Sequence, residues 1–367
     1  MGNTASVNSS RQISPYMVMF VIHPIQIGIG VLSFQHDIVE KAGYDAWISI
    51  LLAGLGIHLL IWLIYGLLNR AGGDLIHIHQ ETFGKWVGGL FSLIFILYFT
   101  TLSTAALRTY AMVVQVWMFP TLATWVICVL MLFLTYYAIN GGFRVVVGVC
   151  FFGFFIPIIG VTWAFAFPFE YMHFRNLLPI LNHSFSDIML STKLMTLSYL
   201  GFCSLLMAYP FIDKPRASQK WAHIGNGFTI LVYFFIGILS FGYYSPGLLM
   251  KTIWPTLTMM KIVQIPFLER FEHIFIPIWL LTMMPNVVLT LWVASRGAKR
   301  LFNIKQRNTL RILIVMVFVA AAFFFPDRRS VTMLNKSYAD FAFYFLYAYL
   351  PILWLVQFVR YKVRKPS

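Results

Sequence analysis

The chain has 367 residues, of which 60% are hydrophobic and only 11% are charged. Soluble domains carry about 25% charged residues, so this composition excludes an ordinary soluble domain and indicates an integral membrane protein. The formal net charge of +15 is interpreted as a signal of membrane topology, and no nucleic-acid partner is expected.

Ten apolar stretches of spanning length follow one another along the chain. A transmembrane helix needs about 20 predominantly apolar residues. The predicted spans cover residues 15–39, 46–68, 86–118, 122–139, 145–168, 193–212, 224–244, 274–295, 309–325 and 339–359. The sequence therefore predicts an all-α integral membrane protein, organised as a single polytopic domain over residues 1–367.

Positive charge is concentrated on one side of this topology. With the N-terminus inside, the inner segments hold 17 Lys and Arg residues against three acids, whereas the outer segments hold nine of each kind. Cytoplasmic loops of membrane proteins carry such an excess of Lys and Arg. We therefore expect a multi-pass membrane protein with both termini in the cytoplasm.

The first predicted span contains the stretch HPIQIGIGVLSF, residues 23–34, which places Pro24, Gly28 and Gly30 near its middle. Proline removes a helical hydrogen bond, and glycine lets backbone and ligand approach closely. A break here would free N–H groups at the start of a second half-helix, where the helix dipole favours a carboxylate. The alternative is that the two glycines only allow close helix packing.

The sixth predicted span, KLMTLSYLGFCSLLMAYPFI, carries a central Gly201 and a late Pro210. Transporters built from inverted repeats have broken helices at corresponding positions of the two halves. Ten spans divide into five and five, which predicts a LeuT-like fold with repeats at about 15–168 and 193–359 and breaks in helices 1 and 6. The plainer interpretation is that Pro210 only ends the sixth helix.

Arg108, in the third predicted span, is the one charged residue well inside a span. Charges at such depth are costly and are functional candidates for that reason. The guanidinium could pair with a ligand carboxylate or extend to the outer interface, and the sequence leaves both interpretations open.

The eighth predicted span contains Thr282, Pro285 and Asn286. Oxygen atoms of Thr282 and Asn286 are candidates for holding a sodium ion against the broken first helix. A proline kink beside a satisfied side chain is the simpler interpretation. The chain shows no cluster of metal ligands, no phosphate-binding glycine loop and no nucleophile triad, so no metal, no cofactor and no enzymatic activity are expected.

Short stretches distributed over almost the whole chain carry a resemblance to a known family. They are Gln12-Ile13-Ser14, Gln26-Ile27-Gly28-Ile29-Gly30, Gly84-Lys85-Trp86-Val87-Gly88, Arg108, Gly142-Phe143-Arg144, Asn176-Leu177-Leu178-Pro179-Ile180-Leu181 and, the most specific, PFLERFEHIFIPIW at residues 266–279. In order and spacing they resemble the spore germination permease family, the B subunits of GerA-type spore germinant receptors. That family belongs to the amino acid–polyamine–organocation superfamily, and the resemblance implies the fold of LeuT.

The resemblance also implies a function. Such subunits are located in the spore inner membrane beside an A-type and a C-type subunit, and they are thought to bind small germinants, often amino acids. Carried onto this chain, the ligand-binding residues would be Gln26, Gly28, Ile29, Gly30, Tyr199, Leu200, Gly201 and Phe202, with Arg108 as a further candidate. Several members carry a carboxylate near the helix-six glycine, where this chain has Phe202 and Cys203, so a germinant amine would depend on backbone carbonyls. An ion-coupled amino-acid permease is the alternative function.

Overall fold

The computed structural model describes residues 8–28, 30–264, 266 and 270–364. These described residues form an all-helical fold without a sheet. The α-helices are α1 (Val18–Gln26), α2 (Gly30–Ala42), α3 (Ala46–Ala71), α4 (Leu75–Trp117), α5 (Thr124–Asn140), α6 (Phe143–Val161), α7 (Ala166–Glu170), α8 (Phe185–Met195), α9 (Leu205–Ala208), α10 (Gln219–Tyr243), α11 (Pro246–Leu249), α12 (Pro255–Met259), α13 (Glu272–Phe302), α14 (Gln306–Val319), α15 (Arg328–Tyr344) and α16 (Leu350–Arg364).

Each predicted span corresponds to one or more of these helices. Seven helical stretches of the described chain are long and apolar enough to cross a membrane, and the apolar helices Thr124–Asn140 and Phe202–Phe211 are shorter. The first predicted span is divided into α1 and α2, and the sixth is divided between α8 and α9. The chain is a multi-pass membrane protein, as its composition predicted.

Two helices begin well before the predicted spans because their first turns are capped by preceding polar residues. α8 begins at Phe185 rather than at residue 193, behind a capping box in which Ser184 and Asp187 exchange hydrogen bonds. α15 begins at Arg328 rather than at residue 339, behind a second capping box at Asp327. Such caps satisfy N–H groups that have no partner in the first helical turn.

The 43-residue α4 covers the third predicted span up to Trp117 and begins eleven residues before it, at Leu75. Asp74 caps the first turn by accepting a hydrogen bond from the His77 N–H at 3.1 Å. Gly84 then adopts a φ of +79°, which separates the first turns from the span. Glycine tolerates this left-handed conformation because it has no Cβ atom.

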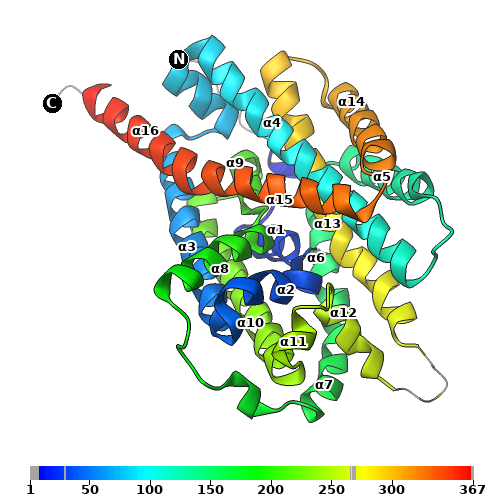
Figure 1. Ribbon diagram of the computed structural model, residues 1–367. Helices are drawn as coiled ribbons and strands as arrows, with labels where there is room; N and C mark the ends of the chain where they lie inside the picture. The colour runs from blue at the N-terminus through cyan, green and yellow to red at the C-terminus, as the bar shows by residue number, and fades with distance from the viewer. Residues whose placement is uncertain (1–7, 29, 265, 267–269, 365–367) are drawn as a thin grey trace.

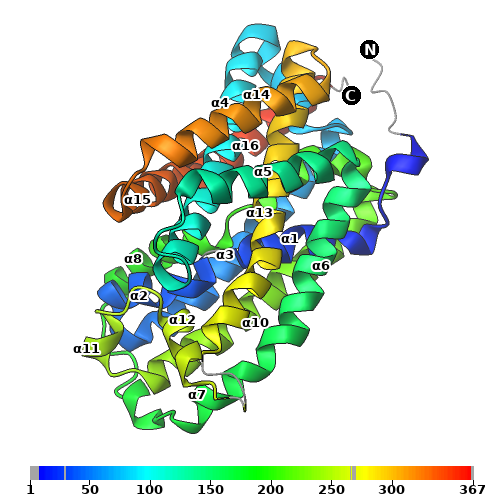
Figure 2. The ribbon, with the colours of Figure 1, turned by 90° about the vertical axis from the view of Figure 1, so that its right-hand side faces the viewer.

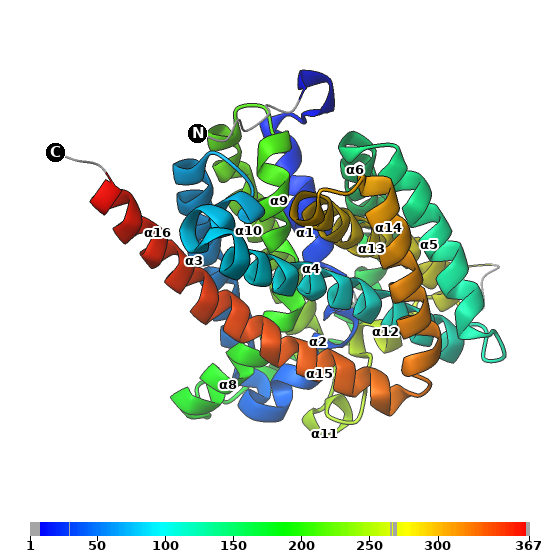
Figure 3. The same ribbon diagram turned by 90° about the horizontal axis from the view of Figure 1, so that it is seen from above.

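The short α1 lies in the middle of the bundle. It packs against α6, α10 and α13, and α13 packs in turn along α4 and α6 (Figure 1). α15 and α16, joined by a π-helical turn at Phe345–Tyr349, form a long helix that crosses α4 and α3 on one side of the bundle (Figure 3). The first broken helix is therefore enclosed by unbroken ones at α1.

The two ends of the bundle differ in their elements. The short α7 and α11 lie at one end, whereas α4 and α14 begin at the other end (Figure 2). The N-terminal segment is attached to the end of the sixth predicted span, just after α9. The Ile13 N–H donates to the Phe211 carbonyl and the Asp213 N–H donates to the Ile13 carbonyl, both at 2.8 Å. The connection between α10 and α13 contains the short helices α11 and α12.

Candidate functional site

The first helix break separates α1, which ends at Gln26, from α2, which begins at Gly30. Pro24, inside α1, has no N–H with which to continue the helical pattern. Ile29, one of the predicted ligand-binding residues, lies outside the described residues. The break predicted in the stretch HPIQIGIGVLSF is confirmed.

The second break lies in the sixth predicted span, between α8 and α9, and contacts the first break. A 3-10 turn at Thr196–Tyr199 follows α8, and Gly201 then adopts a φ of +102° between the buried Leu200 and Phe202. A Cβ atom at Gly201 would lie 2.5 Å from Cγ1 of Ile25 in α1. Glycine is therefore required by the left-handed backbone and by the contact between the two broken helices.

The hydroxyl of Tyr233 in α10 shares its one proton between a freed backbone carbonyl at each break. Its phenol oxygen lies 2.8 Å from the Gln26 carbonyl at the end of α1, and 3.0 Å from the Ser198 carbonyl beside the second break. The Tyr233 ring is fully buried. Unpaired backbone groups at membrane depth are costly unless surrounding protein satisfies them, so one side chain stabilises both breaks.

The Gln26 side chain is fully occupied by protein partners. Its Nε2 donates to Asn226 Oδ1 at 3.1 Å and to the Tyr199 carbonyl at 3.3 Å, and its Oε1 accepts from the Thr229 hydroxyl at 2.7 Å. Asn226 donates in turn to the Gly54 carbonyl of α3 at 3.0 Å. A primary amide has two N–H bonds, and both are used. In this conformation Gln26 holds the end of α1 against Tyr199, in the segment between α8 and α9, and against α10.

The glycines of the first break also permit close packing. A Cβ atom at Gly28 would lie 2.6 Å from Asn286 Oδ1, and one at Gly30 would lie 2.9 Å from Ser198 Oγ. Asn286 additionally donates to the Pro24 carbonyl at 3.2 Å. The helix is therefore broken and closely packed at the same place, and the predicted ion-site residue Asn286 contacts the break directly.

A cavity of about 230 Å³ adjoins the first break on the side of α6, α10 and α13. Pro24, Ile27 and Val31 line it from the broken helix, and most of its other walls are apolar. Two buried groups in its wall, the Thr282 hydroxyl and Trp279 Nε1, have no hydrogen-bond partner among the described residues. Buried polar groups are normally paired, so these two unpaired groups of lining residues are candidates for contact with a bound molecule.

His23, which the sequence reasoning did not select, also lines this cavity. Its Nδ1 lies 2.9 Å from the Thr229 hydroxyl oxygen, which also lies 2.7 Å from Gln26 Oε1 and 3.0 Å from the Gly225 carbonyl. In the tautomer whose Nδ1 carries the proton, Nδ1 donates to Thr229 and Nε2 is an acceptor in the cavity wall.

The short helix α12 forms part of the cavity wall. Thr256 of α12 lines the cavity and donates to the Val31 carbonyl at 2.7 Å. Gln35 of α2 donates to Thr256 Oγ1 at 2.7 Å and to Ser240 Oγ at 2.9 Å. These bonds connect the segment between α10 and α13 to the first turns of α2, so a displacement of α12 has to break them.

Arg108 has partners other than the helix breaks. Its side chain is 3% exposed. Its Nε donates to the Phe325 carbonyl at 2.7 Å, and one terminal nitrogen donates to the Pro326 carbonyl at 3.2 Å. The guanidinium thus satisfies backbone carbonyls of the turn between α14 and α15, which follows the outward end of the ninth predicted span, and it does not contact Gly28 or Gly201 in this conformation.

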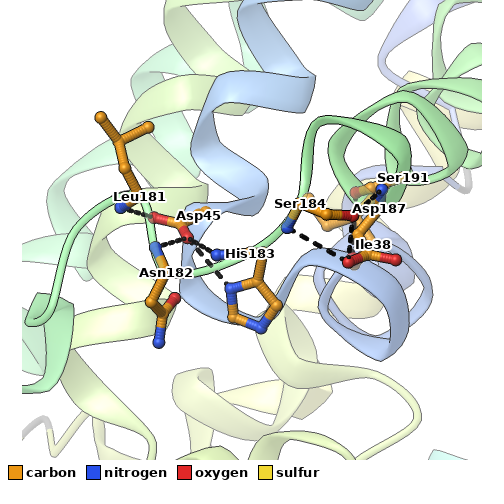
Figure 4. A network of polar contacts seen from close by, with 8 residues as sticks. All are labelled: Ile38, Asp45, Leu181, Asn182, His183, Ser184, Asp187 and Ser191. Atoms are coloured by element: carbon orange, nitrogen blue, oxygen red, sulfur yellow. Dashed lines mark hydrogen bonds and ion pairs between the residues drawn. The ribbon is translucent and has the colours of Figure 1, made fainter.

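Asp45 organises the connection between the first and second spans (Figure 4). Its carboxylate accepts from the backbone N–H groups of Leu181, Asn182 and His183 at 2.7–3.1 Å, and lies 3.0 Å from Nδ1 of the His183 ring. Burial would raise the pKa of Asp45, but the His183 ring and the three N–H groups outweigh it and hold that pKa below its ordinary value. The loop before α8 is thereby attached to the turn between α2 and α3.

The polar face of α10 was missed by the sequence reasoning. Asn226, Thr229 and Tyr233 are spaced three and four residues apart, which places them on one face of an otherwise apolar helix. All three are buried and bond to the first broken helix or to its polar neighbours. Polar residues repeated at helical spacing inside a span were the signal that would have identified them.

Comparison with known proteins agrees with these features. The family model described as "Spore germination protein" matches residues 12–329. The chain belongs to this family. Spore germination protein GerQB of Bacillus cereus is 45% identical over 354 residues, covering 96% of this chain and 98% of GerQB. Spore germination protein YndE of Bacillus subtilis (strain 168) is 24% identical over 352 residues, covering 95% and 96% of the two chains. The resemblance inferred from the sequence is confirmed.

Among solved structures, the chain is similar to a Na⁺-coupled sialic acid symporter in its substrate-bound outward-open state. The TM-score is 0.65 at 12% sequence identity, with 91% of this chain and 79% of the symporter covered. This similarity shows the fold alone, and it confirms the predicted LeuT-like architecture. The chain is thus a permease-like membrane protein of the spore germination family.

Proposed function

We propose that the chain is the ligand-binding membrane subunit of a spore germinant receptor. The observation that carries this proposal is the pair of contacting helix breaks with a cavity of about 230 Å³ beside them. A small nutrient bound there would favour one arrangement of the broken helices and so shift the population toward a signalling state. Membership in the spore germination protein family supports this role.

An apolar amino acid is the nutrient that this site fits best. The first N–H groups of α2 have no acceptor within the helix, and the helix dipole favours an anionic group, so they would receive the α-carboxylate at Gly28–Gly30. The backbone at Leu200–Phe202 and Nε2 of His23 would offer acceptors to the amine. The apolar side chain would occupy the cavity beside Val31 and Phe154, which its lining suits.

A hydroxyl exchange tests this proposal with little risk to folding. Thr282→Val removes a buried hydroxyl that has no hydrogen-bond partner among the described residues, so stability should hold while the ligand loses a hydrogen bond. Thr290→Val on the same helix is the matched control, because the Thr290 hydroxyl bonds only to carbonyls of its own helix. Spores carrying each variant would be titrated with L-valine and L-leucine, with protein levels checked by immunoblot.

We expect Thr282→Val to need several-fold more amino acid for half-maximal germination, because one hydrogen bond contributes about 1 kcal/mol. Thr290→Val should respond as the unmodified chain does. An unchanged response of Thr282→Val, together with an unchanged response after Ile27→Trp fills the cavity, would exclude the cavity as the germinant site.

A second function, ion-coupled amino-acid transport, is favoured by the fold shared with a Na⁺-coupled symporter. In that case Thr282 and Asn286 would contribute oxygen atoms to a sodium site at the first break. Uptake of labelled leucine into vesicles that contain only this chain separates the two functions. Accumulation driven by a sodium gradient would support the transporter and overturn the pure receptor.

The proposal includes a location and partners. Charge asymmetry supports an orientation with both termini in the cytoplasm. We place the chain in the inner membrane of the spore, beside A-type and C-type receptor subunits. Co-purification of both subunits with a tagged chain from spore membranes is the expected result, and recovery of the tagged chain alone would contradict the complex.

A further inference from the structure

A second cavity, of about 410 Å³, lies where α13 ends and α14 begins, and the α5–α6 turn also borders it. Five cationic side chains line it: Arg11, Arg144, Arg296, Lys299 and Arg307. None of its fifteen described lining residues is acidic. We call this volume the basic cavity.

The five cations of the basic cavity outnumber the carboxylates near them in the described chain, where Asp74 is the carboxylate that acts on Arg296. None of them forms a salt bridge with a described carboxylate, whereas Arg300, further along α13, pairs with Asp74 at 3.3 Å. Their hydrogen bonds go to uncharged groups. Arg144 donates to the carbonyls of Ser9 and Gln12, and Arg307 donates to the Tyr136 hydroxyl.

Arg296 has the geometry of a prepared anion ligand. Its guanidinium carbon lies 4.9 Å from the ring centroid of Phe211, and this stacking fixes the plane of the group. Its Nε is buried and has no hydrogen-bond partner among the described residues. Trp292 and Phe143 pack with Phe211 into an aromatic base beneath it. A fixed guanidinium with unused donors suits the oxygens of a phosphate.

We propose that the basic cavity binds the phosphate of an anionic phospholipid headgroup. Like charges around an open volume repel one another, and a bound anion removes that repulsion. Exposed apolar side chains lie on the same elements that border the cavity, at Tyr137 on α5, Val145 on α6 and Ile312 on α14. Acyl chains would lie along this surface, which favours a lipid over free phosphate as the source of the anion. Basic pockets between helices at the cytoplasmic side bind such headgroups.

Native mass spectrometry of the full chain in detergent tests the proposal independently of any germinant. The chain would be titrated with cardiolipin and with phosphatidylcholine, in the presence and absence of millimolar inorganic phosphate. Arg296→Gln with Lys299→Gln removes two charges from the cavity, and Arg307→Gln removes an exposed one with less risk to folding. Lys220→Gln with Lys305→Gln is the matched control, because both residues are exposed and lie outside the cavity.

We expect cardiolipin to bind more tightly than phosphatidylcholine, and each removed cavity charge to weaken it about fivefold. The control should bind as the unmodified chain does. Equal affinity for both lipids, or an unchanged affinity in Arg307→Gln, would overturn the proposal. Full displacement of cardiolipin by inorganic phosphate would show that the ligand is a soluble phosphate, and a preference for a polyglutamate peptide over lipid would show a protein-docking site instead.

Discussion

Replacing Tyr233 by phenylalanine isolates the energy of the hydrogen bonds that close the two helix breaks. The ring volume is kept, so no cavity forms, and only the phenol oxygen is lost. That oxygen lies within 3.0 Å of the Gln26 and Ser198 carbonyls. A phenol has a single proton, so the two contacts share one donor and their energies do not add fully. Leaving buried carbonyls without this donor should cost about 1–3 kcal/mol.

Tyr199→Phe is the matched control for this measurement. Tyr199 is also fully buried, and its ring centroid lies 5.3 Å from that of Tyr233. Its hydroxyl donates to the Ile50 carbonyl at 3.2 Å, which lies within the continuous α3 and keeps its helical partner when the hydroxyl is removed. The loss should therefore be no more than about 0.5–1.5 kcal/mol.

Thermal unfolding of the purified chain in detergent, scanned at one rate for all variants, measures both effects. We expect Tyr233→Phe to unfold a few degrees below the unmodified chain and below Tyr199→Phe. Identical midpoints for Tyr233→Phe and the unmodified chain would refute the role of Tyr233 at the breaks. A larger loss in Tyr199→Phe would show that the intact helices, rather than the breaks, limit stability.

Three further predictions follow from single positions. Gly201→Ala should lose at least about 1–3 kcal/mol of stability, because of its φ of +102° and because the new Cβ would lie 2.5 Å from Ile25 Cγ1. Gly227→Ala, with open space around its Cβ position, should gain about 0.5–1 kcal/mol in the same thermal scan. Asp45 has a folded-state pKa below its ordinary value, so its contribution to folding stability is present above about pH 4 and is lost as pH falls through the folded-state pKa. Asp45→Asn should remove that part of the acid sensitivity. A loss of stability between pH 6 and pH 3 that is the same in Asp45→Asn as in the unmodified chain would contradict this role. Arg108→Met should lower stability by about 1.5–3 kcal/mol through the loss of its two carbonyl contacts, and it should leave the half-maximal germinant concentration unchanged. A tenfold shift in the dose–response curve would show that Arg108 contacts the ligand instead.

The sequence alone determined the membrane class and predicted ten helical segments with breaks in the first and the sixth, while it left close helix packing and a helix end at Pro210 open as alternatives. Long apolar runs identify spans because the bilayer sets their length, and Gly28, Gly30 and Gly201 stand where a regular helix does not favour glycine. The boundaries at Phe185 and Arg328 were missed because the capping residues extend both helices into polar segments, beyond the apolar run.

Only the tertiary structure decided which side chains surround the breaks. Asn226, Thr229 and Tyr233 reach the first break from α10, about 200 residues away in the chain, and no local pattern records which helices become neighbours. Arg108 shows the same limit, because its depth in a span is evident from the sequence whereas its partners at Phe325 and Pro326 depend on how α4 packs against the α14–α15 turn. Hydropathy measures how a segment partitions into the bilayer, and helix packing then selects the partner of each polar group inside it.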